Sequence, residues 1–425
     1  MFFLDNFLKG LKPNFDDDLV DRLNWYYTPM IIIIMSLTLT AKTYMVGQPI
    51  QCWIPAQFTG AWEQYSENYC FVQNTYYLPL HKRIPNSYDE RKNLEIGYYQ
   101  WVPMVLALQA VLFYLPNMVW RILNWQSGIS VKGIIKMALD SKNVDKGPRE
   151  GNVKIVAAHL MDSLEIQREM QTRGRFCGIL FYGRHYGAYV SGLYLFSKFL
   201  YIGNVVAQFF IMNNFLAPDY TFWGFSILKD LIMGREWQES GHFPRVTMCD
   251  LEIRVLGNQH RHTIQCVLMI NMYNEKIYLF LWFWFLLVSV LTIGNTVYWL
   301  VVSTLHPLQR QFIHRYLRVS ENLQDSPGER QALDKFVHRR LRPDGCFILR
   351  MIAENTGDLV VNEIVDELWR KFLEKSQLGP PVPEDSAQDH DGSETALLTS
   401  GSGSGGSSEG DSPPRYTTHF GRQRS

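Results

Sequence analysis

The sequence predicts an all-α membrane protein with four transmembrane helices per subunit, two disulfide-linked extracellular loops and a helical cytosolic domain. Three observations support this fold class: four long apolar runs, an uneven distribution of Lys and Arg between the segments that separate them, and the positions of six cysteines. The 425 residues carry equal numbers of basic and acidic side chains. A net charge of zero gives no indication of nucleic-acid binding.

The four apolar runs cover residues 26–46, 101–123, 189–216 and 277–305. A helix needs about 20 mostly apolar residues to cross the roughly 30 Å of hydrocarbon in a bilayer. Each run is long enough, whereas a buried core helix is usually shorter and interrupted by polar residues. The third run qualifies although it contains Lys198. The sequence therefore predicts four membrane spans, with both termini on the same side.

The basic residues predict the orientation of the spans. Residues 124–188 contain ten Lys or Arg, whereas 47–100 contain four and 217–276 contain six. Because cytosolic loops carry an excess of Lys and Arg, the 124–188 loop and both termini are predicted to be cytosolic. The loops 47–100 and 217–276 then face the outside. Residues 1–24 lack a short apolar region with a cleavage site, so the first span is predicted to act as an uncleaved signal anchor.

The cysteines agree with this orientation. Two lie in each predicted outer loop and two lie singly in cytosolic segments: Cys52 and Cys70, Cys249 and Cys266, and then Cys177 and Cys346. Disulfides persist outside the cell and are rare in the cytosol, so the outer four are predicted to form two bonds. Spacing does not choose among the three possible connectivities. The spacings C-x17-C and C-x16-C are long for a zinc finger, so no metal site is predicted.

Catalytic motifs are scarce, and the sequence predicts neither an enzyme nor a cofactor. It lacks Walker A, GxSxG and HExxH patterns and the histidine boxes of membrane di-iron enzymes. A secondary transporter would usually have more spans and an internal repeat. His260 and His262 in the second outer loop are expected to be solvated, with a pH-sensing role as the alternative. Neither outer loop contains an N-x-S/T sequon, which favours close contact between bare loops.

Two interpretations of the N-terminal segment remain open. Leu4, Phe7, Leu8 and Leu11 fall on one helical stripe. This stripe suits an amphipathic helix at the membrane surface, or a helix folded into the mouth of a pore. The acidic residues that follow, Asp16, Asp17 and Asp18, are expected to form a solvated helix cap.

Hydroxyl side chains recur within the first apolar run, at Ser36, Thr38 and Thr40. They either bond back to the preceding helical turn or form part of a wetted pore wall. The segments 128–176 and 308–375 alternate apolar and charged residues, which predicts amphipathic cytosolic helices. From about residue 377 the chain lacks the apolar residues to form a core and is expected to be disordered.

The hexapeptide YYQWVP lies at the start of the second span, at Tyr98, Tyr99, Gln100, Trp101, Val102 and Pro103. It resembles the hallmark of the innexins, the invertebrate gap-junction proteins. Four further stretches resemble the same family: GQPIQCWIPAQFTGAWEQYSENYCFVQNTYYLP (47–79), FPRVTMCD (243–250), NQHRHTIQCVLMINMYNEKIYLFLWFW (258–284) and LRPDGCFILRMIAENTGDLVVNEIVDELW (341–369). The resemblance covers roughly residues 1–375 and leaves out the tail. Met269 departs from the pattern, because the family suggests a proline there.

The resemblance implies a gap-junction channel, in which subunits form a ring around a central pore. The ring consists of copies of this chain, alone or together with other innexins. The ring docks onto an apposed ring in the plasma membrane of the neighbouring cell, and membrane lipid surrounds it. It implies the disulfides Cys52–Cys266 and Cys70–Cys249. It also favours the pore-mouth interpretation of the N-terminus, with the pore lined by Met1, Phe2, Phe3, Leu4, Thr38, Thr40 and Lys42.

The expected organisation follows from these points. It comprises a cytosolic pore-funnel segment (1–25), the spans 26–46, 101–123, 189–216 and 277–305, extracellular loops (47–100 and 217–276), a helical cytosolic loop (124–188), a cytosolic helical region (306–376) and a Ser/Gly-rich tail (377–425). Two alternative functions differ from an intercellular channel. One is an undocked channel that releases small molecules to the outside, and the other is an adhesion protein that does not conduct.

Overall fold

The structure is a computed structural model. It describes residues 17–45, 47–79, 82–140, 144–169, 187–216, 223–233, 243–320 and 327–377. All of these fall within one compact unit, Met1–Gln377. The expected disordered tail lies outside the described residues from position 378 onward.

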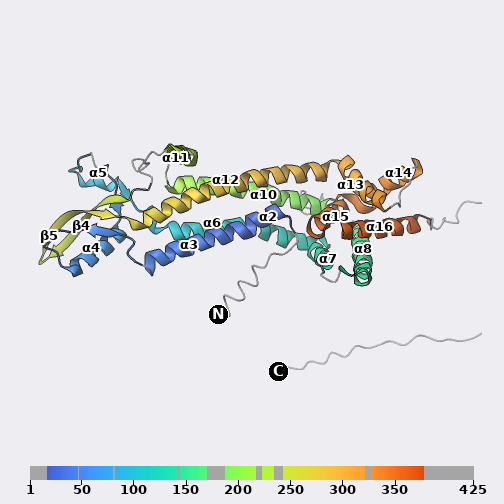
Figure 1. Cartoon of the computed structure of the whole chain (residues 1–425), viewed down its shortest axis with the longest axis horizontal. Helices are drawn as coiled ribbons and strands as arrows, with labels where there is room; N and C mark the ends of the chain where they lie inside the picture. Colours follow the sequence, from blue (N-terminus) through green and yellow to red (C-terminus); the bar gives the residue numbers. More distant parts are fainter. Residues whose placement is uncertain are drawn as a thin grey trace, which may run out of the picture. The chain divides into compact units, whose positions relative to one another are not determined.

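The described residues contain four helices that are long and apolar enough to cross a membrane, which confirms the predicted number of spans. The first is built from α2 (Leu19–Arg22), the π-helical turn η1 (Leu23–Tyr27) and α3 (Thr28–Tyr44). The others are α6 (Val102–Asn124), α10 (Tyr189–Leu216) and α12 (Met269–Thr304). These helices run side by side (Figure 1). Met269, where the family suggests a proline, is the first residue of α12.

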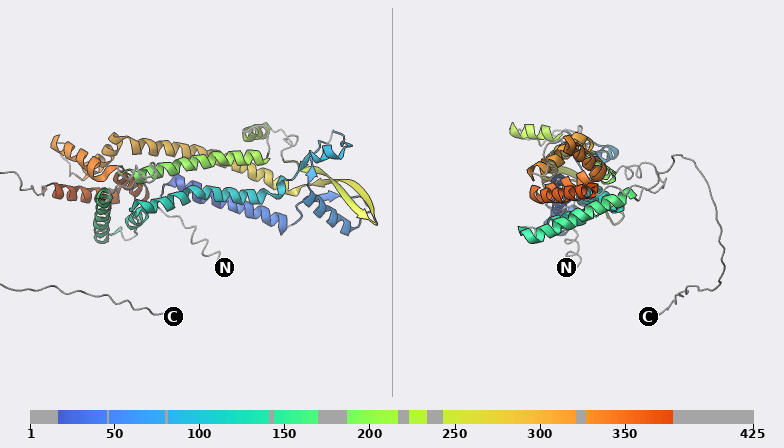
Figure 2. Two further views of the ribbon diagram at one scale, coloured as in Figure 1. Left: turned by 180° about the vertical axis from the view of Figure 1, so that it is seen from behind. Right: turned by 90° about the vertical axis from the view of Figure 1, so that its right-hand side faces the viewer.

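A five-stranded antiparallel sheet stands at one end of the spans (Figure 2). Its order is β1 (Gln51–Trp53), β5 (Asn258–Val267), β4 (Val246–Val255), β2 (Thr75–Tyr76) and β3 (Glu95–Ile96). The same region contains α4 (Gly60–Gln73), α5 (Tyr88–Lys92) and the 3₁₀ turn η2 (Tyr98–Gln100). A further helix, α11 (Trp223–Ile232), packs against α12. We call the sheet with α4 and α5 the outer platform. Three of its strands have only two or three residues, too few for a recognisable alternating pattern in the sequence.

A layer of helices lies at the other end of the spans (Figure 1). It comprises η3 (Trp125–Ser127), α7 (Val131–Ala138), α8 (Lys146–Glu169), α13 (His306–Val319), α14 (Pro327–Lys335), η6 (Phe336–Leu341), α15 (Arg342–Thr356) and α16 (Asp358–Gln377). Their apolar faces share one core, which includes Leu160, Phe336, Ile348 and Trp369. A second core, with Ile32, Phe113, Tyr278 and Phe285, joins the spans to the outer platform. We call the helices η3 to α8 and α13 to α16, which share the first core, the helical layer.

The carboxylate of Asp344 ties the helical layer to the third span. Asp344 belongs to α15 and is fully buried. It accepts hydrogen bonds from the backbone N–H and the hydroxyl of Ser191, at 3.0 and 3.1 Å, in the first turn of α10. The first N–H groups of a helix have no partner within the helix, so a neighbouring carboxylate stabilises them. A side chain distant in the sequence therefore caps α10.

Candidate functional site

Two disulfides connect the outer segments of the chain. Cys52 of β1 lies directly opposite Cys266 of β5 in the sheet, and the two are bonded. Cys70 of α4 is bonded to Cys249 of β4. Each bond joins residues 47–100 to residues 217–276, in the connectivity that the family resemblance implies. All four cysteines are buried, so the bonds lie inside the platform.

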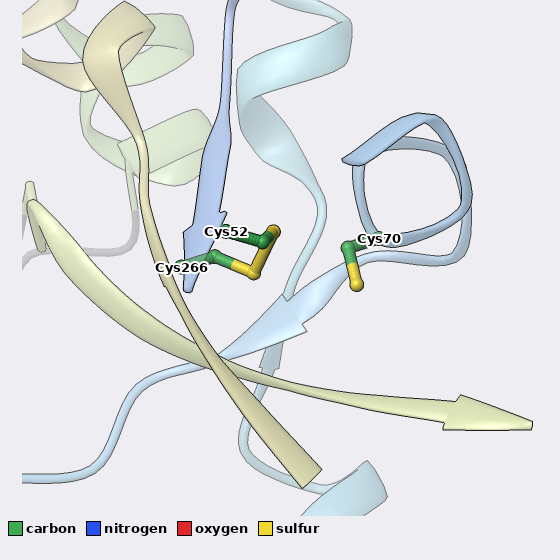
Figure 3. A group of neighbouring side chains, drawn as sticks. All are labelled: Cys52, Cys70 and Cys266. Carbon is green, nitrogen blue, oxygen red and sulfur yellow. A yellow bond between two sulfur atoms is a disulfide. The ribbon is translucent and has the colours of Figure 1, made fainter. Parts of the chain in front are cut away.

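Three cysteine sulfurs gather into one cluster, because the two disulfides are neighbours. The sulfurs of Cys52, Cys70 and Cys266 lie within 4.8 Å of one another. Figure 3 shows these three side chains, with the bond between Cys52 and Cys266. Metals bind the thiolate form of cysteine, and a disulfide sulfur is no longer a thiolate. With both bonds formed, β1 is fastened to β5 and α4 to β4, and the cluster offers no thiolate to a metal.

A partly buried carboxylate holds the edge of the platform together. Both Asp250 oxygens accept hydrogen bonds from Nη1 of Arg91, at 3.2 and 3.0 Å. Asp250 also accepts from the hydroxyls of Thr263, at 2.7 Å, and Tyr76, at 3.3 Å. Burial, together with the charge of Asp250, raises the pKa of Tyr76 to about 12, so the phenol keeps the proton that it donates. These contacts join α5 and β2 to the β4–β5 hairpin.

The tip of the β4–β5 hairpin exposes an apolar side chain. Val255 pairs with Asn258, so Leu256 and Gly257 form a two-residue turn. Both have positive φ angles, +51° and +86°, as a type I′ turn requires. Positive φ is unusual for a leucine. The Leu256 side chain is 99% exposed. The turn lies at the start of β5, whereas α12 follows the other end of that strand.

The hallmark hexapeptide joins the platform to the second span. Tyr99 donates a hydrogen bond from its hydroxyl to the carbonyl of Phe71, at 3.1 Å, near the end of α4. The amide of Gln100 donates to the same carbonyl, at 2.7 Å, and to Oδ1 of Asn74, at 2.9 Å. Trp101 is exposed, and Val102 and Pro103 form the first turn of α6. Tyr98 packs its ring against Phe215 and Phe243.

The two outer histidines differ in their surroundings. His260 is exposed, as expected for a solvated side chain. His262 is only partly exposed, and its ring makes an edge-to-face contact with Phe58, with 5.3 Å between centroids. His262 therefore packs the first outer segment against β5.

The hydroxyl residues of the first span make different contacts. Thr38 and Thr40 donate to the carbonyls of Met35 and Ser36, at 2.7 and 2.8 Å, which confirms back-bonding to the preceding turn for these two. Ser36 instead donates to the carbonyl of Pro103 in α6, at 2.8 Å, because this part of α3 faces α6. Back-bonding was therefore wrong for Ser36.

The residues predicted to line the pore differ in their exposure. Thr38 lies on an exposed face of α3, and Thr40 is partly exposed. Lys42 is also partly exposed, and its Nζ lies 6.0 Å from the ring centroid of Tyr273. The N-terminal residues Met1, Phe2, Phe3 and Leu4 lie outside the described residues.

The acidic group before the first span is not a solvated cap. Asp17 and Asp18 are only 4% and 3% exposed, whereas Asp16 lies outside the described residues. The carboxylates are buried because Lys198 of α10 and Trp25 of η1 donate hydrogen bonds to them. Lys198 matches no motif in the sequence. Its one signal is a charged residue within an apolar run, which is costly unless the charge is paired.

Comparisons with known proteins agree with the resemblance. A family model described as Innexin matches residues 17–372. Innexin unc-9 of Caenorhabditis elegans is 46% identical over 379 residues, which cover 89% of this chain and 97% of that protein. Innexin-3 of the same organism is 41% identical over 379 residues, covering 88% of each chain. Innexin eat-5 is 39% identical over 389 residues, covering 88% and 92%. These matches include the spans, the outer platform and most of the helical layer.

Proposed function

Because this chain belongs to the innexin family of gap-junction channel proteins, we propose that its outer platform docks onto an apposed ring and that its first span lines the pore. The protein is a multi-pass plasma-membrane protein of gap junctions. It forms oligomeric channels that pass ions and small molecules between adjacent cells. The observation that carries the docking proposal is that two disulfides fasten the two outer segments together, one between β1 and β5 and the other between α4 and β4.

Rigidity makes the platform suitable for docking. Ordering a flexible loop at each contact would oppose association between the two rings. The disulfides remove much of this flexibility before the rings meet. The ion pair between Arg91 and Asp250, in which Nη1 of Arg91 contacts both carboxylate oxygens, fixes the remaining edge. The platform thus presents a preformed surface to the neighbouring cell.

The hairpin tip is the proposed contact point. A leucine that is almost fully exposed and has positive φ is unfavourable in an isolated subunit. An apposed platform would cover the Leu256 side chain and bury its apolar surface. We assign this contact to a second copy of the protein, because both rings present the same tip.

The proposed pore wall starts at the N-terminal segment and continues along one face of α3. Thr38 on the exposed face of α3 would contact the permeating solution, followed by Thr40 and Lys42 toward the outside. A conduit for ions and small metabolites needs a wide, wetted wall and no tight selectivity filter. Residues 1–4 would form the narrow cytosolic entrance.

Lipid would surround the outer faces of the spans, and α11 is proposed to lie within the outer leaflet. Gly224 of α11 packs against the ring of Trp282, and Phe225 contacts the same ring, with 4.9 Å between centroids. Trp282 lies inside the apolar run of α12, so α11 is held at the depth of the hydrocarbon. Phe225, Ile232 and Met233 remain exposed to meet acyl chains.

Junctional current between two apposed cells, each expressing only this protein, tests the proposed function. The voltage of each cell is clamped separately. Current that is confined to expressing pairs establishes a homotypic intercellular channel. Silence, with the protein detected at both surfaces, contradicts docking by this chain alone. Dye uptake into single cells then separates an undocked channel from a non-conducting adhesion protein.

A further inference from the structure

The third span contains a lysine that is almost completely buried. Lys198 of α10 is 1% exposed. A charged side chain inside a membrane span is costly, so it is expected to pair with other groups. Its Nζ lies 2.6 Å from Oδ2 of Asp18 and 2.7 Å from Oδ1 of Asp21, at the start of the first span. It also donates to Oδ1 of Asn295 in α12. One ammonium group therefore connects the first, third and fourth spans.

The two carboxylates have further donors that fix their geometry. Trp299 of α12 donates from Nε1 to Asp18, at 2.8 Å, and Tyr194 of α10 donates from its hydroxyl to Asp21, at 2.7 Å. Asp18 also accepts from the backbone N–H of Asp21, at 2.7 Å, as the N-cap of α2. Asp18 therefore has three hydrogen-bond donors: the ammonium group of Lys198, the indole of Trp299 and the backbone N–H of Asp21.

A second set of contacts joins the same point to the helical layer. Nε of Arg22 lies 3.0 Å from Oδ1 of Asp17. Asn355 of α15 donates to the backbone carbonyl of Asp17, at 3.3 Å, and accepts from Arg22. The first described residues of the chain are thus held by the spans on one side and by α15 on the other. We call Asp17, Asp18, Asp21, Lys198 and Asn355, with their contacts, the clamp.

We propose that Lys198 is a positioning residue of the channel: through the clamp it fixes where the N-terminal segment meets the pore mouth. Asp17 directly follows residues 1–16, so a displacement of the clamp displaces the root of that segment. The inference rests on the proposed role of residues 1–4 at the pore entrance.

The test measures the accessibility of a cysteine near the N-terminus. Phe3→Cys is introduced together with Cys177→Ser, which removes a predicted cytosolic thiol. A polyethylene-glycol maleimide is added to permeabilised cells, and the rate of its attachment is read from a gel shift. Lys198→Met alone would leave two buried carboxylates unpaired and risks misfolding. The informative variant therefore combines Lys198→Met with Asp18→Asn and Asp21→Asn, since neutral replacement of a whole buried ion cluster is often tolerated.

The triple variant is expected to reach the surface and to react about tenfold faster at the introduced cysteine, within the usual range of coupling between sites. Lys198→Arg as a single substitution keeps the charge, so the introduced cysteine should still react at the slow rate. The matched control is Lys375→Met, which removes another lysine–carboxylate pair, with Glu165 of α8, away from the clamp. It should react at the wild-type rate.

The outcomes distinguish a failure of this inference from a failure of the proposed function. A triple variant that reacts at the wild-type rate, or a control that reacts as fast as the triple variant, overturns the inference. Labelling does not require current, so a faster triple variant supports the clamp even where wild-type pairs fail to conduct. Absence of junctional current in wild-type pairs would instead contradict the proposed function.

Discussion

Leu256 combines two properties that rarely occur together in a soluble surface turn, full exposure and positive φ. Asn-Gly is the favoured pair for a type I′ turn. Leu256→Asn should therefore keep or improve the hairpin while removing the apolar side chain. We expect junctional current to fall about tenfold or more, the effect of losing a central contact residue. Paired-cell recording checks this.

The control for this change is Leu94→Asn. Leu94 is an exposed leucine of the platform between α5 and β3, away from the hairpin turn, and its replacement should leave the current unchanged. Surface labelling shows whether each variant reaches the membrane. Normal current in Leu256→Asn pairs would contradict the proposed docking contact.

At the scale of single elements, the cap on α10 predicts a pH dependence. Burial raises the pKa of Asp344 above its ordinary value of 3.8. The folded protein then holds this proton more tightly than the unfolded chain. Stability is lost as pH rises from the ordinary value through the raised one. Asp344→Asn mimics the protonated form, so its thermal midpoint relative to wild type should rise with pH over this range. Thermal unfolding of the purified protein in detergent measures it.

Glu165 supplies the control with the opposite sign. A hydrogen bond from Lys375 lowers the pKa of Glu165, so its contribution to stability is present above the ordinary value of 4.5 and disappears as pH falls. The deficit of Glu165→Gln relative to wild type should shrink toward acid pH. Parallel profiles for the two variants would contradict the assignment for Asp344.

The contact between α11 and α12 depends on the absence of a side chain at Gly224. A Cβ there would lie 2.4 Å from Cδ2 of Trp282, whose ring is buried. Gly224→Ala must therefore separate the two helices, which typically destabilises by about 1–3 kcal/mol. A lower thermal midpoint in detergent is expected.

The matched variant is Gly203→Ala in α10, where a new Cβ meets nothing within 4 Å. Alanine has the higher helix propensity, so the midpoint should stay constant or rise. Equal decreases in both variants would mean that the contact with Trp282 is not the cause.

For the whole molecule, the disulfides decide whether the outer segments act as one body. The bond between Cys52 and Cys266 closes a separation of 214 residues in the sequence. Such bonds typically stabilise by about 2–4 kcal/mol by restricting the unfolded chain. We expect Cys52→Ser to abolish junctional current, because β1 is no longer fastened to β5. Paired-cell recording with surface labelling measures this.

Two further variants show whether the loss of current is caused by the missing bond or by the unpaired thiol of Cys266. Cys52→Ser with Cys266→Ser removes the unpaired thiol, and it should also fail to couple if the bond itself is required. Cys177→Ser, a lone cysteine predicted to be cytosolic, should couple normally. Normal current in the double variant would contradict a need for the covalent link.

Local features of the sequence were enough to predict the number of spans, the sides of the membrane and the family. These follow from local properties: the length of an apolar run, the charges beside it and short motifs such as the hexapeptide at 98–103. The clustering of Cys52 and Cys70 in one outer segment, and of Cys249 and Cys266 in the other, indicated disulfides without choosing between connectivities. The family resemblance supplied the pairing that the structure contains.

Which distant residues meet became known from the packed structure. The platform pairs β1 with β5 and β2 with β4, and strands of two or three residues leave no periodic signal of their own. Asp18 appeared to be a solvated cap, because its partner Lys198 lies 180 residues away in the sequence. A buried charge is stable only beside its counter-charge, and that proximity is a property of packed helices. The composition of the two segments therefore does not predict that Asp18 and Lys198 meet.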